Sequence, residues 1–196
     1  MLRVLVLLFL ISPCAVATSG IYITSASGWA AQSGLPSAYN AQAQAAEAKH
    51  YPVLRLGLGY LHDFNTKFGL GFEVGRGWYR GTTYNFSSKA IAIDSKTLEF
   101  LAVFAWHSQP FDFFVKLGGI RHTLQGFTAI TGATDASETR IQPEVGGGVN
   151  YNFTEHFALI AEYLHSFGDK LQDFTAGSLR CPSVNAVLVG IRITFW

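Results

Sequence analysis

The sequence contains few charged residues and almost no cysteine. Only 14% of its 196 residues are charged, whereas about a quarter are charged in a typical soluble domain. The formal net charge is +1, and basic residues are scattered among acidic ones. This distribution lacks the basic patch on which nucleic-acid binding depends. The only cysteines are Cys14 and Cys181.

Long apolar runs are also absent beyond the N-terminus, although 49% of the residues are hydrophobic. No later run approaches the roughly 18 residues that a transmembrane helix needs. A closed β-barrel is the other structure able to span a bilayer, because it satisfies every backbone polar group internally. The 20 glycines and the 14% aromatic content are typical of such barrels.

The N-terminus has the pattern of a secretory signal peptide. Arg3 precedes the apolar stretch 4–11, and residues 15–17 form an Ala-Val-Ala cleavage site. We therefore expect a signal peptide at residues 1–17 and one mature domain at residues 18–196.

Two alternative interpretations of this segment are weaker. The apolar stretch is too short for a transmembrane anchor. A lipoprotein would use Cys14, but Pro13 stands where a small residue is usual. With the signal peptide removed, Cys181 has no intramolecular disulfide partner.

Apolar residues alternate with glycine, polar or small residues through the mature chain, for example in 68–74, 98–106 and 187–195. Alternation with a period of two predicts strands that bury one face. We predict eight strands, at Ile21–Gln32, Tyr51–His62, Lys67–Thr82, Lys96–Trp106, Asp112–Leu124, Arg140–Tyr151, Phe157–Phe167 and Asn185–Trp196.

The predicted connections alternate between short and long. Short turns are expected at 63–66, 108–111 and 152–155, and the long polar loops are Gln32–His50, Thr83–Lys96, Gln125–Thr139 and Asp169–Ser183. This asymmetry is typical of a transmembrane barrel with tight periplasmic turns and long extracellular loops. The predicted fold is all-β, an eight-stranded antiparallel up-and-down transmembrane β-barrel.

Aromatic residues cluster at the predicted strand ends, as in the interfacial girdles of membrane barrels. The expected girdle residues are Tyr60, Phe64, Phe68, Trp78, Tyr79, Trp106, Phe111, Phe113, Tyr151, Phe153 and Phe157.

The same alternation places one charged residue of each of seven strands on the inner face. A soluble sandwich, the competing fold, would rarely bury one ion per strand, because desolvation costs several kcal/mol each. A barrel lumen can pair them, so we expect a mostly plugged lumen; a narrow gated pore is the alternative. The predicted lumen charges are Arg55, Glu73, Glu99, Lys116, Glu144, Glu162 and Arg192.

The segment 142–163 carries a family resemblance. It contains the pattern Pro-x-x-Gly-x-Gly-x-x-Tyr-x-Phe-Thr from Pro143 to Thr154, followed by Ala-Glu-Tyr at 161–163. In this it resembles the OmpA-like and OmpX-like small outer-membrane barrels of Gram-negative bacteria, which include opacity-type surface antigens. The resemblance implies an outer-membrane location, surface-exposed loops and interior contacts between Glu and Arg or Lys. The candidates for these contacts are Glu144, Glu162, Lys116 and Arg192.

The C-terminus resembles the assembly signal of these barrels, which implies the outer-membrane assembly machinery as a partner. The expected signal residues are Ile193, Phe195 and Trp196. The outward series is Ile191, Ile193 and Phe195, so Trp196 lies one residue beyond the family pattern. Either the machinery accepts both aromatic residues or a bulge restores the register.

No catalytic residue, metal ligand or cofactor is predicted, so we expect that the chain is not an enzyme. The alternative is a lipid-modifying enzyme, since some small barrels act on lipid A. His165 and Ser166 are adjacent, and neighbouring strand residues point to opposite faces. We expect His50, His107 and His156 near strand ends, at the interface or in solvent.

Two roles are given equal weight. One is a structural barrel of the envelope, and the other is adhesin-like interaction through the four long loops, because loops on a rigid scaffold carry function. The expected partners are outer-membrane lipid or lipopolysaccharide, the assembly machinery and a host-surface ligand.

Overall fold

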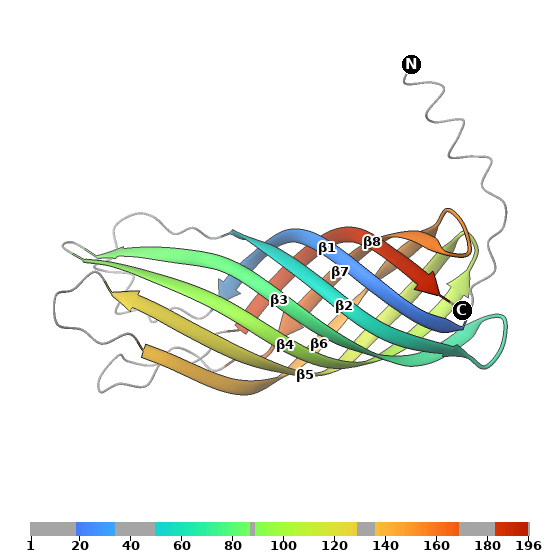
Figure 1. Cartoon of the computed structure of the whole chain (residues 1–196), viewed down its shortest axis with the longest axis horizontal. Coiled ribbons are helices and arrows are strands. Elements are labelled where there is room, and N and C mark those ends of the chain that lie inside the picture. Colours follow the sequence, from blue (N-terminus) through green and yellow to red (C-terminus); the bar gives the residue numbers. More distant parts are fainter. Residues whose placement is uncertain (1–18, 34–49, 87–88, 129–135, 169–182, 196) are drawn as a thin grey trace, which may run out of the picture.

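A computed structural model describes residues 19–33, 50–86, 89–128, 136–168 and 183–195. Within these residues, eight antiparallel strands close into a barrel in chain order, β1 pairing with β8 (Figure 1). No helix in this part of the chain is long and apolar enough to cross a membrane. The strands are β1 Gly20–Ser33, β2 Tyr51–Asp63, β3 Phe68–Phe86, β4 Lys89–Ser108, β5 Phe111–Thr128, β6 Ala136–Asn152, β7 Phe157–Ser166 and β8 Ser183–Phe195.

The predicted fold class and strand number are confirmed, but two predicted loops are wrong. Most of Thr83–Lys96 and much of Gln125–Thr139 belong to paired strands, because β3 continues to Phe86 and β4 begins at Lys89. These segments contain β-branched and aromatic residues, which favour strands despite their polar neighbours. A register shift between Tyr79 and Thr82 marks a β-bulge in this hairpin. The other two predicted loops lie largely outside the described residues.

The short connections lie where the sequence predicts them, between β2 and β3, β4 and β5, and β6 and β7. Side chains stabilise two of these turns. The Asn65 Oδ1 atom accepts hydrogen bonds from the backbone N–H groups of Lys67 and Phe68, and Thr154 Oγ1 accepts them from those of His156 and Phe157. The turns therefore define one end of the barrel, which is the periplasmic end by the asymmetry of such barrels.

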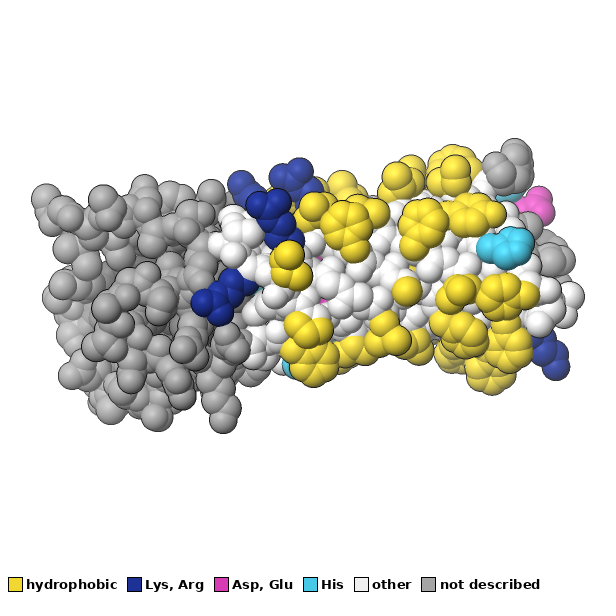
Figure 2. Space-filling model, turned by 90° about the horizontal axis from the view of Figure 1, so that it is seen from below, with side chains coloured by type: hydrophobic (Ala, Val, Ile, Leu, Met, Phe, Trp, Pro, Cys, Tyr) yellow, Lys and Arg dark blue, Asp and Glu magenta, His cyan; other side chains and the backbone are white. Residues whose placement is uncertain are grey.

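The two faces of each strand differ as the alternation predicts. Along β2 and β7, buried lumen residues alternate with exposed ones. The exposed outer residues are mainly large and apolar, and they form the yellow surface in Figure 2. The assignment of Tyr79 to an interfacial girdle is wrong. Its neighbour Trp78 faces outward, so Tyr79 faces the lumen and is buried.

One side of the barrel is taller than the rest. Strands β3 to β6 have 17 to 20 residues, whereas about 9–11 tilted residues cross the hydrocarbon. The turns are level at the periplasmic end, so the additional length lies at the opposite end (Figure 1). About eight further residues at 3.3 Å each raise this wall by about 20 Å at a 45° tilt.

Candidate functional site in the barrel lumen

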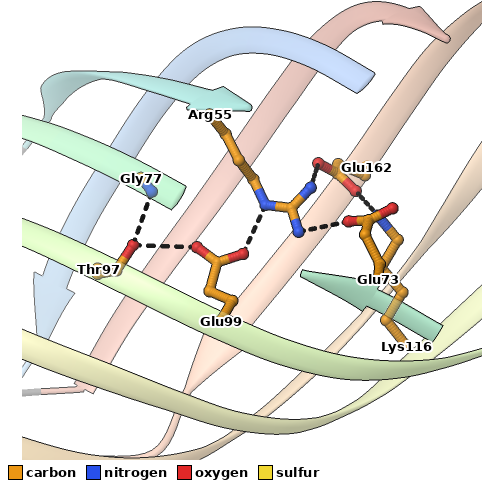
Figure 3. Close-up of polar contacts among 7 residues, drawn as sticks. All are labelled: Arg55, Glu73, Gly77, Thr97, Glu99, Lys116 and Glu162. Atoms are coloured by element: carbon orange, nitrogen blue, oxygen red, sulfur yellow. Dashed lines mark hydrogen bonds and ion pairs between the residues drawn. The ribbon is translucent and has the colours of Figure 1, made fainter. Parts of the chain in front are cut away.

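Arg55 is the centre of a buried charge network in the lumen (Figure 3). Its Nε atom donates to Glu99 Oε2 at 2.7 Å, and Nη2 donates to Glu73 Oε1 at 2.5 Å. The third nitrogen, Nη1, lies 3.2 Å from Glu162 Oε1. A planar guanidinium has five donors in a fixed fork, so it can serve three carboxylates from three strands.

Lys116 is the second cation of the network. Its Nζ atom donates to Glu73 Oε1 at 2.9 Å and to Glu162 Oε2 at 2.7 Å. Glu73 and Glu162 therefore each bind both cations. All four side chains, with that of Glu99, are at most 2% exposed, so solvent screens these ion pairs little.

The network reaches across the barrel. Its members lie on β2, β3, β4, β5 and β7, and β3 and β7 are opposite each other in a closed ring of eight strands. Two cations bind the carboxylates of these opposite strands, while Thr97 Oγ1 links Glu99 to the backbone N–H of Gly77. The polar contacts therefore connect walls that share no backbone ladder.

Glycine makes room for the network beside Arg55. A Cβ atom at Gly75 would lie 2.5 Å from Glu99 Oε2 and 2.7 Å from Arg55 Nη2. Gly57 similarly faces Thr24 and the carboxylate of Glu73. These glycines allow long charged side chains from neighbouring strands to occupy the narrow lumen.

The remaining two predicted lumen charges are buried but separate from the five residues of the network. The Arg192 guanidinium lies over the ring of Tyr22, 3.9 Å from its centroid, a cation–π contact. Glu144 is 3% exposed. Among the described residues, Glu144 Oε2 and Arg192 Nε have no hydrogen-bond partner.

Apolar side chains lie on both sides of the charged layer. The periplasmic apolar layer consists of Tyr22, Leu61, Val103, Ala105, Phe114 and Ile160. The extracellular apolar layer consists of Ala26, Ala30, Tyr51, Val53, Tyr79, Leu164, Val184, Ala186 and Leu188. The network therefore lies between two apolar clusters along the lumen axis, with Arg192 over Tyr22 in the periplasmic one and His122 beside Tyr79 in the extracellular one.

A second polar cluster lies at the periplasmic end and was missed in the sequence. His107 Nε2 lies 3.0 Å from Asp63 Oδ1, and His107 Nδ1 lies 2.9 Å from Asp112 Oδ1. Asn152 donates to Asp112 Oδ2 at 2.7 Å. The expectation of an interfacial or solvent-exposed His107 is wrong, because the side chain points into the lumen and is buried. The one signal in the sequence for a lumen-facing His107 was its odd residue number, because odd-numbered residues of β4 face the lumen.

Two serine–histidine combinations are candidates for a catalytic pair, His165 with Ser166 and Ser95 with His122. His165 bonds Asn185 at 2.7 Å, whereas Ser166 is buried on the other face of the strand, so these two do not pair. Ser95 instead hydrogen-bonds His122, whose Nδ1 lies 3.4 Å from the amide oxygen of Gln142. This contact was not predicted. It is buried, and a neutral amide lacks the charge with which a triad carboxylate stabilises imidazolium.

The C-terminal strand places Phe195 outward and half-exposed, with Ile191 on the same face and Ile193 partly exposed. Trp196, Cys14, Cys181 and the predicted signal peptide lie outside the described residues. Within those residues, no three His, Cys, Asp or Glu side chains gather as metal ligands would.

A closed antiparallel barrel with an apolar outer wall and a charged lumen defines a small outer-membrane barrel protein. The family described as "Outer membrane protein beta-barrel domain" has a sequence model that matches residues 3–195 of this chain. The chain therefore belongs to the outer-membrane β-barrel family, and its location is the outer membrane.

Solved structures share this fold. Neisserial surface protein A is 17% identical with a TM-score of 0.61, covering 90% of this chain and 98% of that one. The attachment invasion locus protein Ail of Yersinia pestis, in complex with a heparin analogue, is 17% identical with a TM-score of 0.58, covering 90% and 97%. OprG from Pseudomonas aeruginosa is 12% identical with a TM-score of 0.51, covering 91% and 97%. The search of curated proteins finds no match.

Proposed function

We propose that this protein is a structural outer-membrane barrel whose lumen is closed to ions, with no catalytic role. The supporting observation is the Arg55-centred network, in which two cations and three carboxylates connect opposite walls. A water path would have to separate these ion pairs. It would also have to cross the apolar layers above and below them. Leaving a buried charge unpaired costs about 3–5 kcal/mol, which strongly disfavours an open state.

Planar-bilayer recording of the purified barrel tests this closure. The expected result is a membrane without steady channel currents. Arg55→Met leaves three glutamates without their shared partner and should permit hydrated openings, whereas Arg76→Met on the outer wall should not. Large steady currents from the unmodified protein would overturn the closed lumen. Brief openings of the unmodified protein, with a frequency that rises on loss of Arg55 but not of Arg76, would favour the narrow gated pore.

Attachment to another surface is a second candidate function, favoured by the tall wall formed by β3 to β6. This wall extends about 20 Å beyond the length needed for the hydrocarbon, so it would carry its extracellular end away from the lipid surface. Ail, which shares the fold, is described as an attachment invasion locus protein. In this role the barrel is a rigid scaffold, and a host-surface ligand is the proposed partner.

Shortening the tallest hairpin tests attachment. Thr82 and Ile93 are cross-strand partners, so residues 83–92 can be replaced by an Asn-Gly turn while the pairing below is kept. Attachment predicts reduced binding of expressing cells to host cells or matrix, with outer-membrane level and heat-modifiable gel migration unchanged. Undiminished binding by the shortened protein would rule out this wall as the contact.

The lipid-modifying alternative has a direct test. Mass spectra of lipid A from cells with and without the protein are expected to be identical. Loss of an acyl chain that depends on Ser95 or His122, or on His165 or Ser166, would contradict the proposed absence of catalysis.

A further inference from the structure

The outer wall segregates charge by sign. Among strand residues whose side chains the structure describes, the exposed charged ones are Arg76 on β3, Lys96 on β4 and Arg121 on β5. The carboxylates at mid-strand, those of Glu73, Glu99, Glu144 and Glu162, all face the lumen. These three cations, called the outer cation cluster below, therefore face the bilayer side, and among the strand side chains that the structure describes no exposed carboxylate shares this face with them.

The register brings the outer cation cluster together. Leu98 pairs with Arg76 on one side and with Arg121 on the other, so the two arginines are two strand spacings apart, about 10 Å. Lys96 lies two residues further along β4 on the same face, diagonal to both arginines at about 7–8 Å. Long, flexible side chains from these positions can converge on one polyanionic group.

The cluster lies at the extracellular end of the apolar band. On β4, Lys96 is ten residues from the interfacial Trp106, which corresponds to about 25 Å along the barrel axis at a 40° tilt. This equals the height of a typical lipid-facing band, about 25 Å. Figure 2 shows dark blue basic side chains where the yellow surface ends. The cations are therefore at the level of the outer-leaflet headgroups.

A surface groove adjoins the cluster. It has a volume of about 540 Å³, and its outward-facing lining residues are Ser27, Pro52, Leu54, Trp78 and Lys96. Lys96 belongs to both features, and the Arg76 guanidinium lies 5.3 Å from the centroid of the Trp78 ring. An apolar groove next to a cationic cluster fits a molecule with an acyl chain and an anionic head.

We propose that the outer cation cluster binds the phosphates of a lipid A-type glycolipid in the outer leaflet, with one acyl chain in the groove. Arg offers a bidentate fork for phosphate, and Lys adds a point charge. Each cation near an anionic membrane surface contributes about 1 kcal/mol, so three together correspond to about a hundredfold in affinity. The proposal rests on the outer-membrane location and is independent of the closed lumen and of attachment.

Native mass spectrometry of the full barrel in zwitterionic micelles tests the proposal, with purified bisphosphorylated lipid A as the probe. The triple variant Arg76→Gln, Lys96→Gln and Arg121→Gln should bind lipid A about a hundredfold more weakly. Lys67→Gln, which removes an exposed cation at a periplasmic turn, is the matched control and should bind as the unmodified protein does. Chemically dephosphorylated lipid A should bind the unmodified protein as weakly as lipid A binds the triple variant.

Three results would overturn the proposal. The first is that the triple variant binds lipid A with unchanged affinity. The second is that the unmodified protein binds dephosphorylated lipid A as tightly as lipid A. The third is displacement of lipid A by equimolar inorganic phosphate, which would indicate a general anion site. If the triple variant lacks heat-modifiable migration, Arg76→Lys with Arg121→Lys replaces it and should keep most of the affinity. In parallel, raised salt should weaken binding to the unmodified protein, and salt-independent binding would contradict the phosphate contact.

Discussion

The inner and outer walls of the barrel are built from the same strands, yet they surround an arginine with different partners. Arg55 faces the lumen and contacts three carboxylates, whereas Arg76 on the adjacent strand faces outward and lies beside Trp78. The inner guanidinium is fixed by three carboxylates. Without it, Glu99 would lose the cation that it binds, while Glu73 and Glu162 would keep only Lys116. The outer guanidinium lies over an aromatic ring, and its proposed counter-ion is a lipid phosphate. Period-two alternation alone separates these two environments.

The largest expected difference between the walls follows from removing each arginine. Arg55→Met should lower the free energy of unfolding by about 3–5 kcal/mol, because three buried carboxylates lose their shared cation. Arg76→Met, in lipid without anionic glycolipid, should change it by about 0.5 kcal/mol or less. Urea unfolding in phospholipid vesicles measures both. Equal effects would show that the lumen network is not a stabilising unit.

The next largest expected difference in stability is between two glycine-to-alanine substitutions. Gly75→Ala should cost about 1–3 kcal/mol, because the added methyl group would overlap Arg55 and Glu99 in a filled lumen. Gly119→Ala is the matched control, since its Cβ would meet no heavy atom closer than 3.8 Å. The same unfolding assay compares the two. A tolerated Gly75→Ala would mean that the lumen has free space beside Arg55.

The periplasmic cluster should give a smaller effect. Both His107 ring nitrogens lie beside carboxylate oxygens, and carboxylates only accept, so we expect both nitrogens to be protonated at neutral pH. Nitrogen chemical shifts of the labelled ring test this directly. His107→Gln should cost about 1–2 kcal/mol through the lost charge-assisted hydrogen bonds. Nitrogen chemical shifts typical of a neutral imidazole tautomer would contradict a charged His107.

The smallest effect is expected at a lipid-facing apolar position. Leu56 pairs with Arg76 on the outer wall and is 43% exposed. Truncation there leaves no cavity in a packed interior, so Leu56→Ala should cost less than the 2–5 kcal/mol of a core leucine. Leu164→Ala, in the extracellular apolar layer of the lumen, should fall within that range. Similar costs at both sites would mean that the lumen is no better packed than the lipid face.

Much of the barrel follows from local sequence, because alternation is a local property. It predicts eight strands, and it places Arg55 and Glu162 on inner faces. The continuation of β3 and β4 through 83–96 could not be predicted from alternation. It depends on the pairing of two segments with each other, and neither has a strong strand pattern of its own. Here cross-strand hydrogen bonds outweighed the polar composition that suggested a loop.

Side-chain partners were less predictable than faces. The sequence gives seven inward charges, but strand stagger decides that Arg55 meets Glu99 and Glu162 while Arg192 lies on Tyr22. The cluster of His107 with Asp63 and Asp112 was missed for the same reason. His107 and Asp112 are cross-strand partners in the β4–β5 hairpin, but Asp63 on β2 reaches them only through the curvature of the barrel.

The central claim is that ion pairs across the lumen join strands that have no ladder between them, and a double-mutant cycle on Arg55 and Glu162 tests it most directly. The two residues lie on β2 and β7 with a 3.2 Å contact. Unfolding free energies of the parent, Arg55→Met, Glu162→Gln and the double variant should give a coupling of about 1–3 kcal/mol. A coupling near zero would contradict the account, because the two walls would then be stabilised independently.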